Sequence, residues 1–303
     1  MRTSVISRLA AATFAVLAAA SLAGAALAGP ADDAANWRKV DPENLLQITV
    51  NGGTILVEMR PDFAPAHVAQ IKKIARAGHY DGLPFFRVID EFMAQGGDTY
   101  AKYQLYPKPY GDLKAEFTFK RKPATQPVQW LANPDDGKTD WDRIGYYQGF
   151  LVAGKNDAAA DLAADGAVQT FPLYCAGIAA MARADNPNSA DTQYFLMRQN
   201  RSGPDALDAS YTVWGRALTG LDVIRGIKAG PKSADGRMPD GDKATKVQVV
   251  ADIKSAAKRP TIYVQRTDGP EFAKALAAGQ GADYSKACEL PPVPIVLEMP
   301  PSE

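Results

Sequence analysis

Residues 83–98 read Leu-Pro-Phe-Phe-Arg-Val-Ile-Asp-Glu-Phe-Met-Ala-Gln-Gly-Gly-Asp. The aromatic and β-branched residues at 85–89 predict a β-strand. One cation, Arg87, interrupts this strand, and a buried arginine is rare unless it is paired or used. Most arginines on strands lie on a solvated face or in a structural ion pair, so the meaning of Arg87 depends on the residues around it.

The residues after this strand supply an apolar surface and an amide. Phe92 and Met93 are apolar, Gln95 follows two residues later, and Gly96-Gly97 allows backbone conformations that are closed to other residues. A Phe-Met pair alone is more typical of a core. An arginine, an amide and an apolar surface together favour a site that holds a neutral, partly apolar ligand by hydrogen bonds.

The ordered string resembles the signature of the cyclophilins, the cyclosporin-binding class of peptidyl-prolyl isomerases. That signature runs Phe-His-Arg-Val/Ile-Ile, then two residues, then Phe-Met-x-Gln-Gly-Gly-Asp. Phe86 stands where many members have histidine, and the remaining positions match. The preceding residues also follow the order of a cyclophilin: a hairpin at 45–59 that turns at Asn51-Gly52-Gly53, and then a helix at 66–77.

Later segments resemble the family's substrate groove and closing elements. Ala182-Arg183-Ala184 resembles a groove wall, and residues 193–196 resemble its Gln-Phe-Phe-Ile strand, in which alternation puts Gln193 and Phe195 on one face. The resemblance covers about 45–253, with Tyr211 in place of the histidine of many eukaryotic members. It implies that the proline pocket and the groove are lined by Phe86, Phe92, Met93, Ala182, Arg183, Ala184, Gln193, Phe195, Leu207 and Tyr211.

The resemblance implies a peptidyl-prolyl cis-trans isomerase with two catalytic residues. Arg87 would donate a hydrogen bond to the prolyl nitrogen of a twisted amide, and Gln95 would hold a substrate carbonyl and orient Arg87. No bond is made or broken in this reaction, so we expect no cofactor and no metal. The alternative is a non-catalytic module or chaperone that binds proline segments on the same barrel. A hydrolase is disfavoured, because the sequence offers no Ser/His/Asp or Cys/His arrangement.

Short strands separated by Gly and Pro turns favour a mainly β fold, which could be a barrel or a sandwich. The resemblance implies a closed eight-stranded antiparallel barrel capped by helices. The family's Gly-x-x-x-Met-Ala segment comes only at 177–182, so residues 120–172 are interpreted as a long insertion. Residues 254–303 are interpreted as a C-terminal extension, which is either loose or docked, because it is too small to bury a core alone.

Residues 1–28 have the features of a secretory signal peptide. Arg2 and Arg8 precede an apolar stretch at 9–22, and small residues at 26 and 28 form a cleavage site. The alternative is an uncleaved membrane anchor, which needs about 20 strongly apolar residues. Cleavage would leave a linker at 29–44 and a periplasmic or secreted protein without membrane contact.

The charge balance, the histidines and the cysteines limit which partners, metals and bridges this chain can have. The chain has 34 basic and 34 acidic residues, which gives no support for nucleic acid as a partner. We expect a monomer that binds proline-containing polypeptides. His67 and His79 have no ligand-like neighbours and are interpreted as helix-end residues. Cys175 and Cys288 are expected to form a disulfide in an oxidising compartment, and two free thiols are the alternative.

Overall fold

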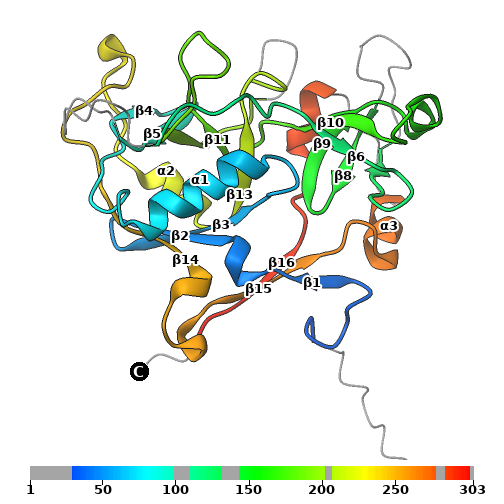
Figure 1. Cartoon of the computed structure of the whole chain (residues 1–303). Coiled ribbons are helices and arrows are strands. Elements are labelled where there is room, and N and C mark those ends of the chain that lie inside the picture. The colour runs from blue at the N-terminus through cyan, green and yellow to red at the C-terminus, as the bar shows by residue number, and fades with distance from the viewer. Residues whose placement is uncertain (1–28, 99–109, 132–142, 202–206, 278–283, 301–303) are drawn as a thin grey trace, which may run out of the picture.

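The computed structural model describes residues 29–98, 110–131, 143–201, 207–277 and 284–300, so the predicted signal peptide lies outside it. An eight-stranded antiparallel sheet forms the larger part of the molecule (Figure 1). Its strands, in spatial order, are β14 (Ala244–Val249), β2 (Leu45–Val50), β3 (Gly53–Met59), β13 (Val213–Thr219), β11 (Ile178–Met181), β12 (Tyr194–Met197), β5 (Met93–Gly96) and β4 (Arg87–Ile89).

The hairpin predicted at 45–59 is confirmed as β2 and β3, and its turn sets the register. Asn51 and Gly52 have φ values of 51° and 75°, the left-handed conformation that Asn and Gly adopt most readily. Leu45 therefore pairs with Glu58. Because side chains alternate along a strand, β3 packs one set into the core and points the other, which includes Glu58, away from it.

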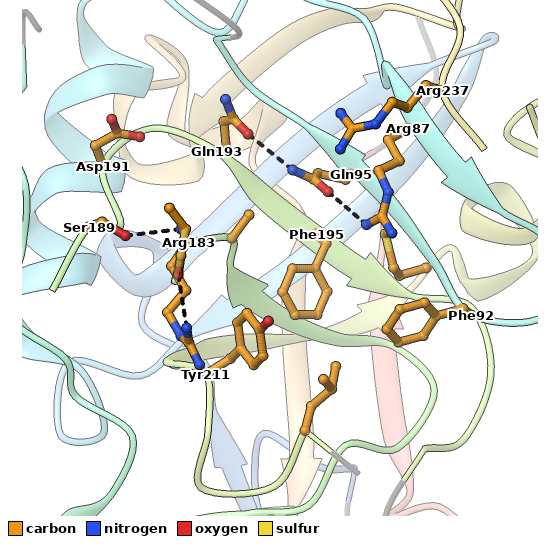
Figure 2. Close-up of a pocket in the computed structure, with 14 residues that line it drawn as sticks. Arg87, Phe92, Gln95, Arg183, Ser189, Asp191, Gln193, Phe195, Tyr211 and Arg237 are labelled. Carbon is orange, nitrogen blue, oxygen red and sulfur yellow. Dashed lines mark hydrogen bonds between the residues drawn. The ribbon is translucent and has the colours of Figure 1, made fainter. Parts of the chain in front are cut away.

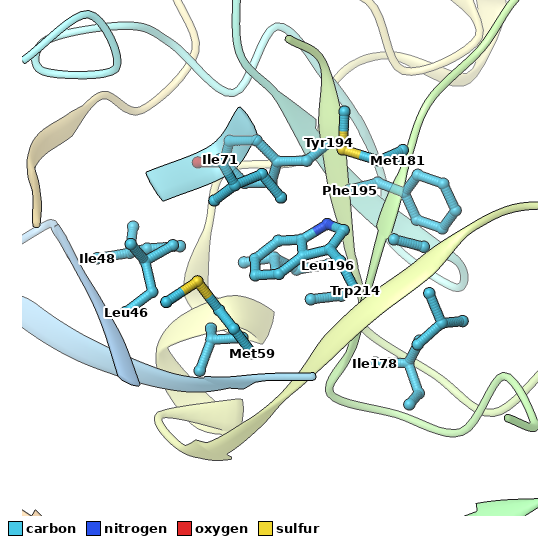
Figure 3. Close-up of a cluster of buried hydrophobic side chains, with 14 of the residues drawn as sticks. Leu46, Ile48, Met59, Ile71, Ile178, Met181, Tyr194, Phe195, Leu196 and Trp214 are labelled. Atoms are coloured by element: carbon cyan, nitrogen blue, oxygen red, sulfur yellow. The ribbon is translucent and has the colours of Figure 1, made fainter. Parts of the chain in front are cut away.

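The main core lies between this curled sheet and the helix α1 (Pro65–Arg76), close to the helix predicted at 66–77 (Figure 3). Trp214 of β13 is fully buried in it, and the ring of Tyr194 meets Trp214 edge-on at 6.1 Å. Helical spacing gives α1 one buried face that packs against the sheet. The buried residues of that helix are His67, Val68, Ile71, Ile74 and Ala75.

The expected closure of the barrel is wrong, because no ladder joins the edge strands β4 and β14. Within the described residues, two isolated bridges connect the segments that lead into these strands: Pro84 with Lys243, and Arg87 with Arg237. The chain advances by three residues from Pro84 to Arg87, whereas the opposite segment needs six residues from Arg237 to Lys243. Regular pairing cannot absorb this difference, and Pro84 has no N–H to donate. The sheet is an open, curled half-barrel.

Two smaller sheets lie beside the half-barrel (Figure 1). The segment 119–172 forms the first, with the spatial order β6 (Phe119–Arg121), β10 (Val168–Pro172), β9 (Phe150–Gly154), β8 (Arg143–Tyr147) and β7 (Gln129–Trp130). The second joins distant parts of the chain as β1 (Trp37–Lys39), β15 (Thr261–Gln265) and β16 (Ile295–Glu298). The remaining α-helices are α2 (Leu221–Gly226) and α3 (Pro270–Ala277).

Short 3-10 helices connect several of these elements. They are η1 (Pro42–Asn44), η2 (Asp157–Leu162), η3 (Lys232–Ala234), η4 (Val250–Asp252), η5 (Ala256–Lys258) and η6 (Tyr284–Glu289).

Two segments differ from their predicted structure. The linker expected at 29–44 contributes β1 to a sheet, because its backbone pairs with β15. The apolar and aromatic residues at 113–119 predict a strand by composition, but this segment is extended and mostly unpaired. Leu113 forms an isolated bridge with Ala190, and a regular strand begins only at Phe119. Polar groups between these points bond to helix α1 and to side chains instead of a neighbouring strand.

A second apolar cluster fills the space between the three sheets. Leu45 and Leu56 belong to it because they lie on the outer face of the β2–β3 hairpin. Its C-terminal members show that the described part of the C-terminal segment is docked rather than loose. These members are Ile262, Val264, Phe272, Ala287 and Val293.

Charged groups cross the same junction. Arg38 of β1 binds the carboxylate of Glu58 at 2.6 and 2.9 Å and donates to the carbonyl of Gln148 at 2.7 Å. Arg216 stands opposite Glu58 in the β3–β13 register, and its guanidinium lies 5.1 Å from the ring centre of Phe150. Burial lowers the pKa of Arg216 to about 10, which still leaves it charged at neutral pH. The outer face of the half-barrel is therefore bound to β1 and to the β8–β9 hairpin.

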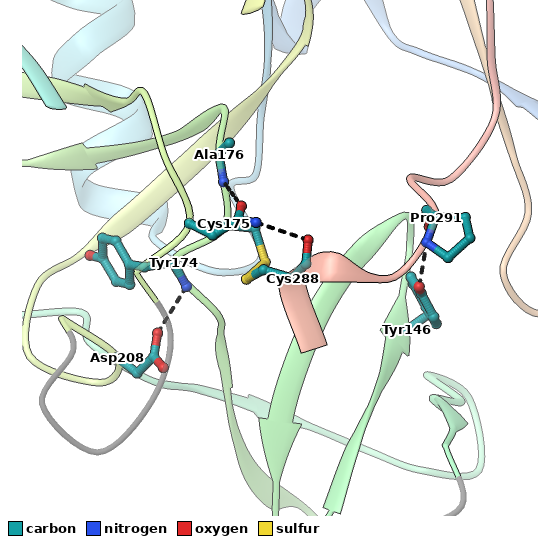
Figure 4. The surroundings of a disulfide bond; sticks show 8 residues. Tyr146, Tyr174, Cys175, Ala176, Asp208, Cys288 and Pro291 are labelled. Atoms are coloured by element: carbon teal, nitrogen blue, oxygen red, sulfur yellow. Dashed lines mark hydrogen bonds between the residues drawn. A yellow bond between two sulfur atoms is a disulfide. The ribbon is translucent and has the colours of Figure 1, made fainter. Parts of the chain in front are cut away.

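The predicted disulfide between Cys175 and Cys288 is present, with Cα atoms 5.2 Å apart (Figure 4). The side-chain N–H of Asn200 donates to the carbonyl of Cys288 at 3.1 Å. The side-chain oxygen of Asn200 accepts from the N–H of Ala176, next to Cys175, at 2.9 Å. Tyr146 of β8 donates to the carbonyl of Pro291 at 3.3 Å. The C-terminal segment is thus attached to both the half-barrel and the five-stranded sheet that contains β8.

Denatured, unreduced protein is expected to show no free thiol on titration, and reduction should reveal the two cysteines. The bridge joins residues 113 positions apart. Its removal in Cys288→Ala should lower the free energy of unfolding by about 4 kcal/mol in the chain-entropy model. A non-reducing gel shows whether the bridge is within one chain. Free thiols in the unreduced protein, or a variant as stable as wild type, would contradict the prediction.

A residue from a distant segment caps the start of α1. Glu116 accepts hydrogen bonds from the N–H groups of Ala66 and His67 at 3.2 Å each, and contacts Nδ1 of His67 at 2.6 Å. Ala64 at the N-cap position offers no side-chain bond, so Glu116 supplies the negative charge that a helix N-terminus favours. Burial raises the pKa of Glu116, but the hydrogen bonds from His67 and the backbone lower it by more. The net pKa is therefore below its ordinary value.

Glu116→Gln is expected to lower the free energy of unfolding at neutral pH by about 1–2 kcal/mol, since the charged cap is lost. A carboxyl with a lowered folded-state pKa stabilises the fold above its ordinary pKa of 4.5, and this contribution is lost as pH falls through the folded value. Urea unfolding should therefore show the two proteins converging below pH 4.5. A constant difference there would contradict this cap. Glu298→Gln, an exposed change on β16, is the control.

Candidate active site

Three strands place the two predicted catalytic residues in one row with an aromatic ring. Arg87 of β4 pairs with Gln95 of β5, which pairs in turn with Phe195 of β12. Directly paired residues share a face of the sheet, so these side chains stand side by side (Figure 2). Their neighbours along the strands are fully buried in the core: Val88, Ala94 and Leu196. Strand register therefore puts the row on the outer face of the half-barrel.

A chain of hydrogen bonds orients the polar members of the row (Figure 2). Nη1 of Arg87 donates to Oε1 of Gln95 at 3.2 Å, and Nε2 of Gln95 donates to Oε1 of Gln193 at 3.0 Å. Nε2 of Gln193 donates to the carbonyl of Asp98 at 2.9 Å. Each amide accepts at one end and donates at the other, so the orientation of one fixes the next. The backbone carbonyl anchors the chain, which holds Arg87 in place.

A close approach of two backbones makes this chain possible. Gly97 has a φ of 102°, and a Cβ atom there would lie 2.6 Å from the carbonyl oxygen of Thr192. Only glycine allows this contact without displacing the backbone. The approach brings Gln193, next to Thr192, within reach of Gln95, which explains the second glycine of the signature.

A cavity of about 600 Å³ opens beside the row. Phe92, Met93, Phe195 and Leu207 form its apolar wall, and the ring of Tyr211 meets Phe195 edge-on at 5.9 Å. Apolar ring faces and a held guanidinium thus border one space. Such a cavity fits a ligand that is apolar on one side and carries hydrogen-bonding groups on the other.

Tyr174 supports this wall from beneath. Its ring stacks on Phe195 at 6.2 Å, and its hydroxyl donates to the carbonyl of Tyr211 at 2.9 Å. Its N–H donates to Asp208 at 2.8 Å (Figure 4). Burial raises the pKa of the Tyr174 hydroxyl well above its ordinary value, so the hydroxyl stays protonated and remains a donor. Because Cys175 comes next, the disulfide fixes the backbone that carries this support.

Arg183 forms the opposite wall of the cavity, and its guanidinium is bonded to neighbouring groups of the protein. Its guanidinium lies 4.3 Å from the ring centre of Tyr211 and 5.5 Å from that of Phe117. Its N–H groups donate to the backbone carbonyls of Ser210, Ala184 and Asp185. These bonds use most of the guanidinium donors, so Arg183 shapes the groove at Ala182-Arg183-Ala184 through packing.

The cavity gathers every predicted site residue except Phe86. Alternation along the chain points Phe86 away from the face that carries Arg87, which explains why it does not line the cavity. Sequence reasoning missed three lining residues, which are Ser189, Asp191 and Arg237. Asp191 precedes Gln193 by two positions, so alternation could have placed it on the same face. No local signal points to Arg237, which a distant loop supplies.

Neither a metal cluster nor a membrane helix is found in the part of the chain that the structure describes. No three His, Cys, Asp or Glu side chains there are grouped to hold a metal ion. His67 lies in the first turn of α1 and His79 follows its last turn, as predicted, and each bonds a carboxylate. None of the described helices has the length and apolar character needed to cross a membrane.

Comparisons with known proteins agree with this geometry. Residues 45–249 match the family model of the cyclophilin type peptidyl-prolyl cis-trans isomerase/CLD. A probable peptidyl-prolyl cis-trans isomerase of Brucella suis is 35% identical over 214 residues, covering 71% of this chain and 86% of that protein. A peptidyl-prolyl cis-trans isomerase of Streptomyces antibioticus is 27% identical over 216 residues, covering 70% and 96%.

A solved structure extends the comparison to most of the chain. The crystal structure of the cyclophilin AquaCyp293 from Hirschia baltica has a TM-score of 0.77 at 36% identity, and the match covers 89% of this chain and 96% of that one. The range matched by the family model, 45–249, includes Arg87, Gln95 and Phe195. The chain therefore belongs to the family of cyclophilin-type peptidyl-prolyl cis-trans isomerases, and it is an isomerase of X-Pro peptide bonds.

Proposed function

We propose that this isomerase turns X-Pro bonds during the folding of exported proteins, with Arg87 and Gln95 as its catalytic residues. The observation that carries the proposal is the row in which a held guanidinium, an amide and an apolar wall border one cavity. A proline ring would pack on Phe92, Met93 and Phe195, and the amide that precedes it would lie against Arg87.

The chemistry follows from the bond itself. Rotation about a peptide bond crosses a barrier of about 18–20 kcal/mol that amide resonance creates. Unassisted X-Pro isomerisation therefore takes on the order of tens to hundreds of seconds. In the twisted state the prolyl nitrogen regains a localised lone pair and accepts a hydrogen bond, which the planar amide does not. A donor at this nitrogen stabilises the twisted state more than the ground state, and that difference is catalysis.

Arg87 and Gln95 divide this work. The guanidinium of Arg87 is always charged and only donates, so it suits a developing lone pair. Gln95 accepts from Arg87 and donates to Gln193 through one N–H of its amide. The second N–H of that amide remains to bond a substrate carbonyl. Gln95 would thus orient both the donor and the peptide.

Arg87→Ala should lower turnover of an X-Pro peptide on the order of 10²–10³-fold, by analogy with the loss of one oxyanion-hole donor. The measurement is a protease-coupled assay or NMR exchange, with a thermal melt to show that the variant folds. Arg266→Ala is the matched control. It removes an arginine from another arginine–aspartate pair, and Arg266 is 39% exposed, follows β15 and lies outside the cavity. Wild-type turnover in a folded Arg87→Ala variant would refute the role of Arg87.

Two features support export of this isomerase, and we propose that it works as a monomer. Residues 1–28 have the pattern of a secretory signal peptide. The Cys175–Cys288 disulfide joins the half-barrel to the C-terminal segment, and such bridges persist in oxidising compartments. Proline-containing polypeptides that fold in the periplasm or outside the cell would be its substrates.

Expression of the full chain in a Gram-negative host should yield a periplasmic protein whose first residue is Gly29. Fractionation and N-terminal sequencing measure this outcome, and light scattering on a sizing column should give the mass of one chain. A version without residues 1–28 is the control, and it should stay in the cytoplasm. Full-length protein that remains in the cytoplasm with Met1 or Arg2 at its start would contradict export.

A further inference from the structure

The loop between α2 and β14 reaches the catalytic row through its backbone. Arg237 forms an isolated antiparallel bridge with Arg87, and the N–H of Val88 donates to the carbonyl of Gly236 at 2.8 Å. The N–H of Met238 donates to the carbonyl of Phe86 at 2.9 Å. These bonds hold the loop against β4 on the side that Gln95 leaves open.

Local backbone geometry places a carboxylate at this contact. Gly236 has a φ of 72°, and a Cβ atom there would lie 2.5 Å from the carbonyl oxygen of Val88, so the close approach needs glycine. Asp235 ends the short helix η3 in the left-handed conformation, with a φ of 53° that aspartate tolerates better than most residues. Its N–H donates to the carbonyl of Lys232 at 3.1 Å. Asp235 is therefore positioned by main-chain bonds before its side chain makes any contact.

The carboxylate of Asp235 grips one edge of the Arg87 guanidinium. Nε of Arg87 donates to Oδ2 at 3.0 Å and Nη2 donates to Oδ1 at 3.2 Å. Gln95 accepts from Nη1 at 3.2 Å. A guanidinium has five N–H donors, so these three bonds leave two N–H groups for a substrate. A planar group held by both partners has a fixed plane.

Arg237 adds a positive charge beside Arg87 that the carboxylate of Asp235 offsets. Residues paired across a bridge place their side chains on one face, and like charges there repel. Both side chains line the same cavity, and Figure 2 draws them in the same part of it. Among the described residues, no ion pair to Arg237 is present. If the carboxylate of Asp235 were absent, this repulsion would favour other rotamers of the Arg87 side chain.

We propose that Asp235 is the positioning residue of this isomerase: its carboxylate fixes the plane of the Arg87 guanidinium against the repulsion of Arg237. The inference rests on the catalytic role proposed for Arg87. Asp235 is 59% exposed, Arg87 is 21% exposed and Arg237 is exposed, so water screens both the attraction of Asp235 and the repulsion of Arg237. The effect of Asp235 is therefore on geometry, which governs the twisted state, and not on the affinity for the peptide.

Two variants test the carboxylate without straining the backbone. Asp235→Asn and Asp235→Gly both accept the left-handed conformation, but Asn keeps one acceptor for Arg87 and Gly keeps none. NMR exchange on an Ala-Pro peptide gives the rate of interconversion on the enzyme, and a titration gives Kd. Interconversion should fall about fivefold in Asp235→Gly, and by less in Asp235→Asn, with Kd unchanged. Asp240→Asn, in the same loop and paired with Lys228, should match wild type.

The same change in an Arg87→Ala background separates positioning from folding. Asp235→Gly is expected to leave the residual turnover of Arg87→Ala unaltered, because no guanidinium remains to be positioned. An equal loss in both backgrounds would show that Asp235 acts on the fold, and it would overturn the inference. Unchanged interconversion in Asp235→Gly alone, or a loss confined to Kd, would overturn it as well. Wild-type turnover in Arg87→Ala would instead refute the proposed function, and the inference with it.

Discussion

The arrangement of the three sheets depends on one buried carboxylate. Glu58 is 4% exposed, and an ionised group at such a position must be paired. Arg38 from β1 makes that pair and also binds the β8–β9 turn through the carbonyl of Gln148. Arg216 of β13 adds a second positive charge opposite Glu58, and its guanidinium packs on the ring of Phe150. Three distant parts of the chain therefore meet at one acidic side chain on the outer face of the half-barrel.

The same sheet supplies a rigid support for the site, and less regular segments complete it. Strand register alone aligns Arg87, Gln95 and Phe195, because paired residues share a face. The surrounding supports come from outside the strands. Tyr174 holds Phe195 next to the disulfide, and the loop before β14 reaches Arg87. This division is common in enzymes, where loops on a fixed scaffold carry the parts that tune activity.

Local patterns predicted the parts of this protein whose physics is local. The Asn51-Gly52-Gly53 turn predicted its hairpin, the spacing of apolar residues predicted α1, and alternation predicted that Gln193 and Phe195 share a face. Prediction failed where pairing partners lie far apart. The run at 113–119 has the composition of a strand, but it has little neighbouring backbone to pair with. Closure of the barrel failed for a similar reason, since the segments that approach each other there differ in length.

By itself, the sequence determined the family, the β2–β3 hairpin, helix α1 and the identity of the two bridged cysteines, because each is encoded in residues that are close together or few in number. Only the tertiary structure decided that β1 joins the C-terminal strands and that Asp235 and Arg237 face Arg87. These contacts join residues more than a hundred positions apart in the chain. No short-range periodicity specifies such a contact, because it depends on how the whole sheet curls and on which backbones it brings together.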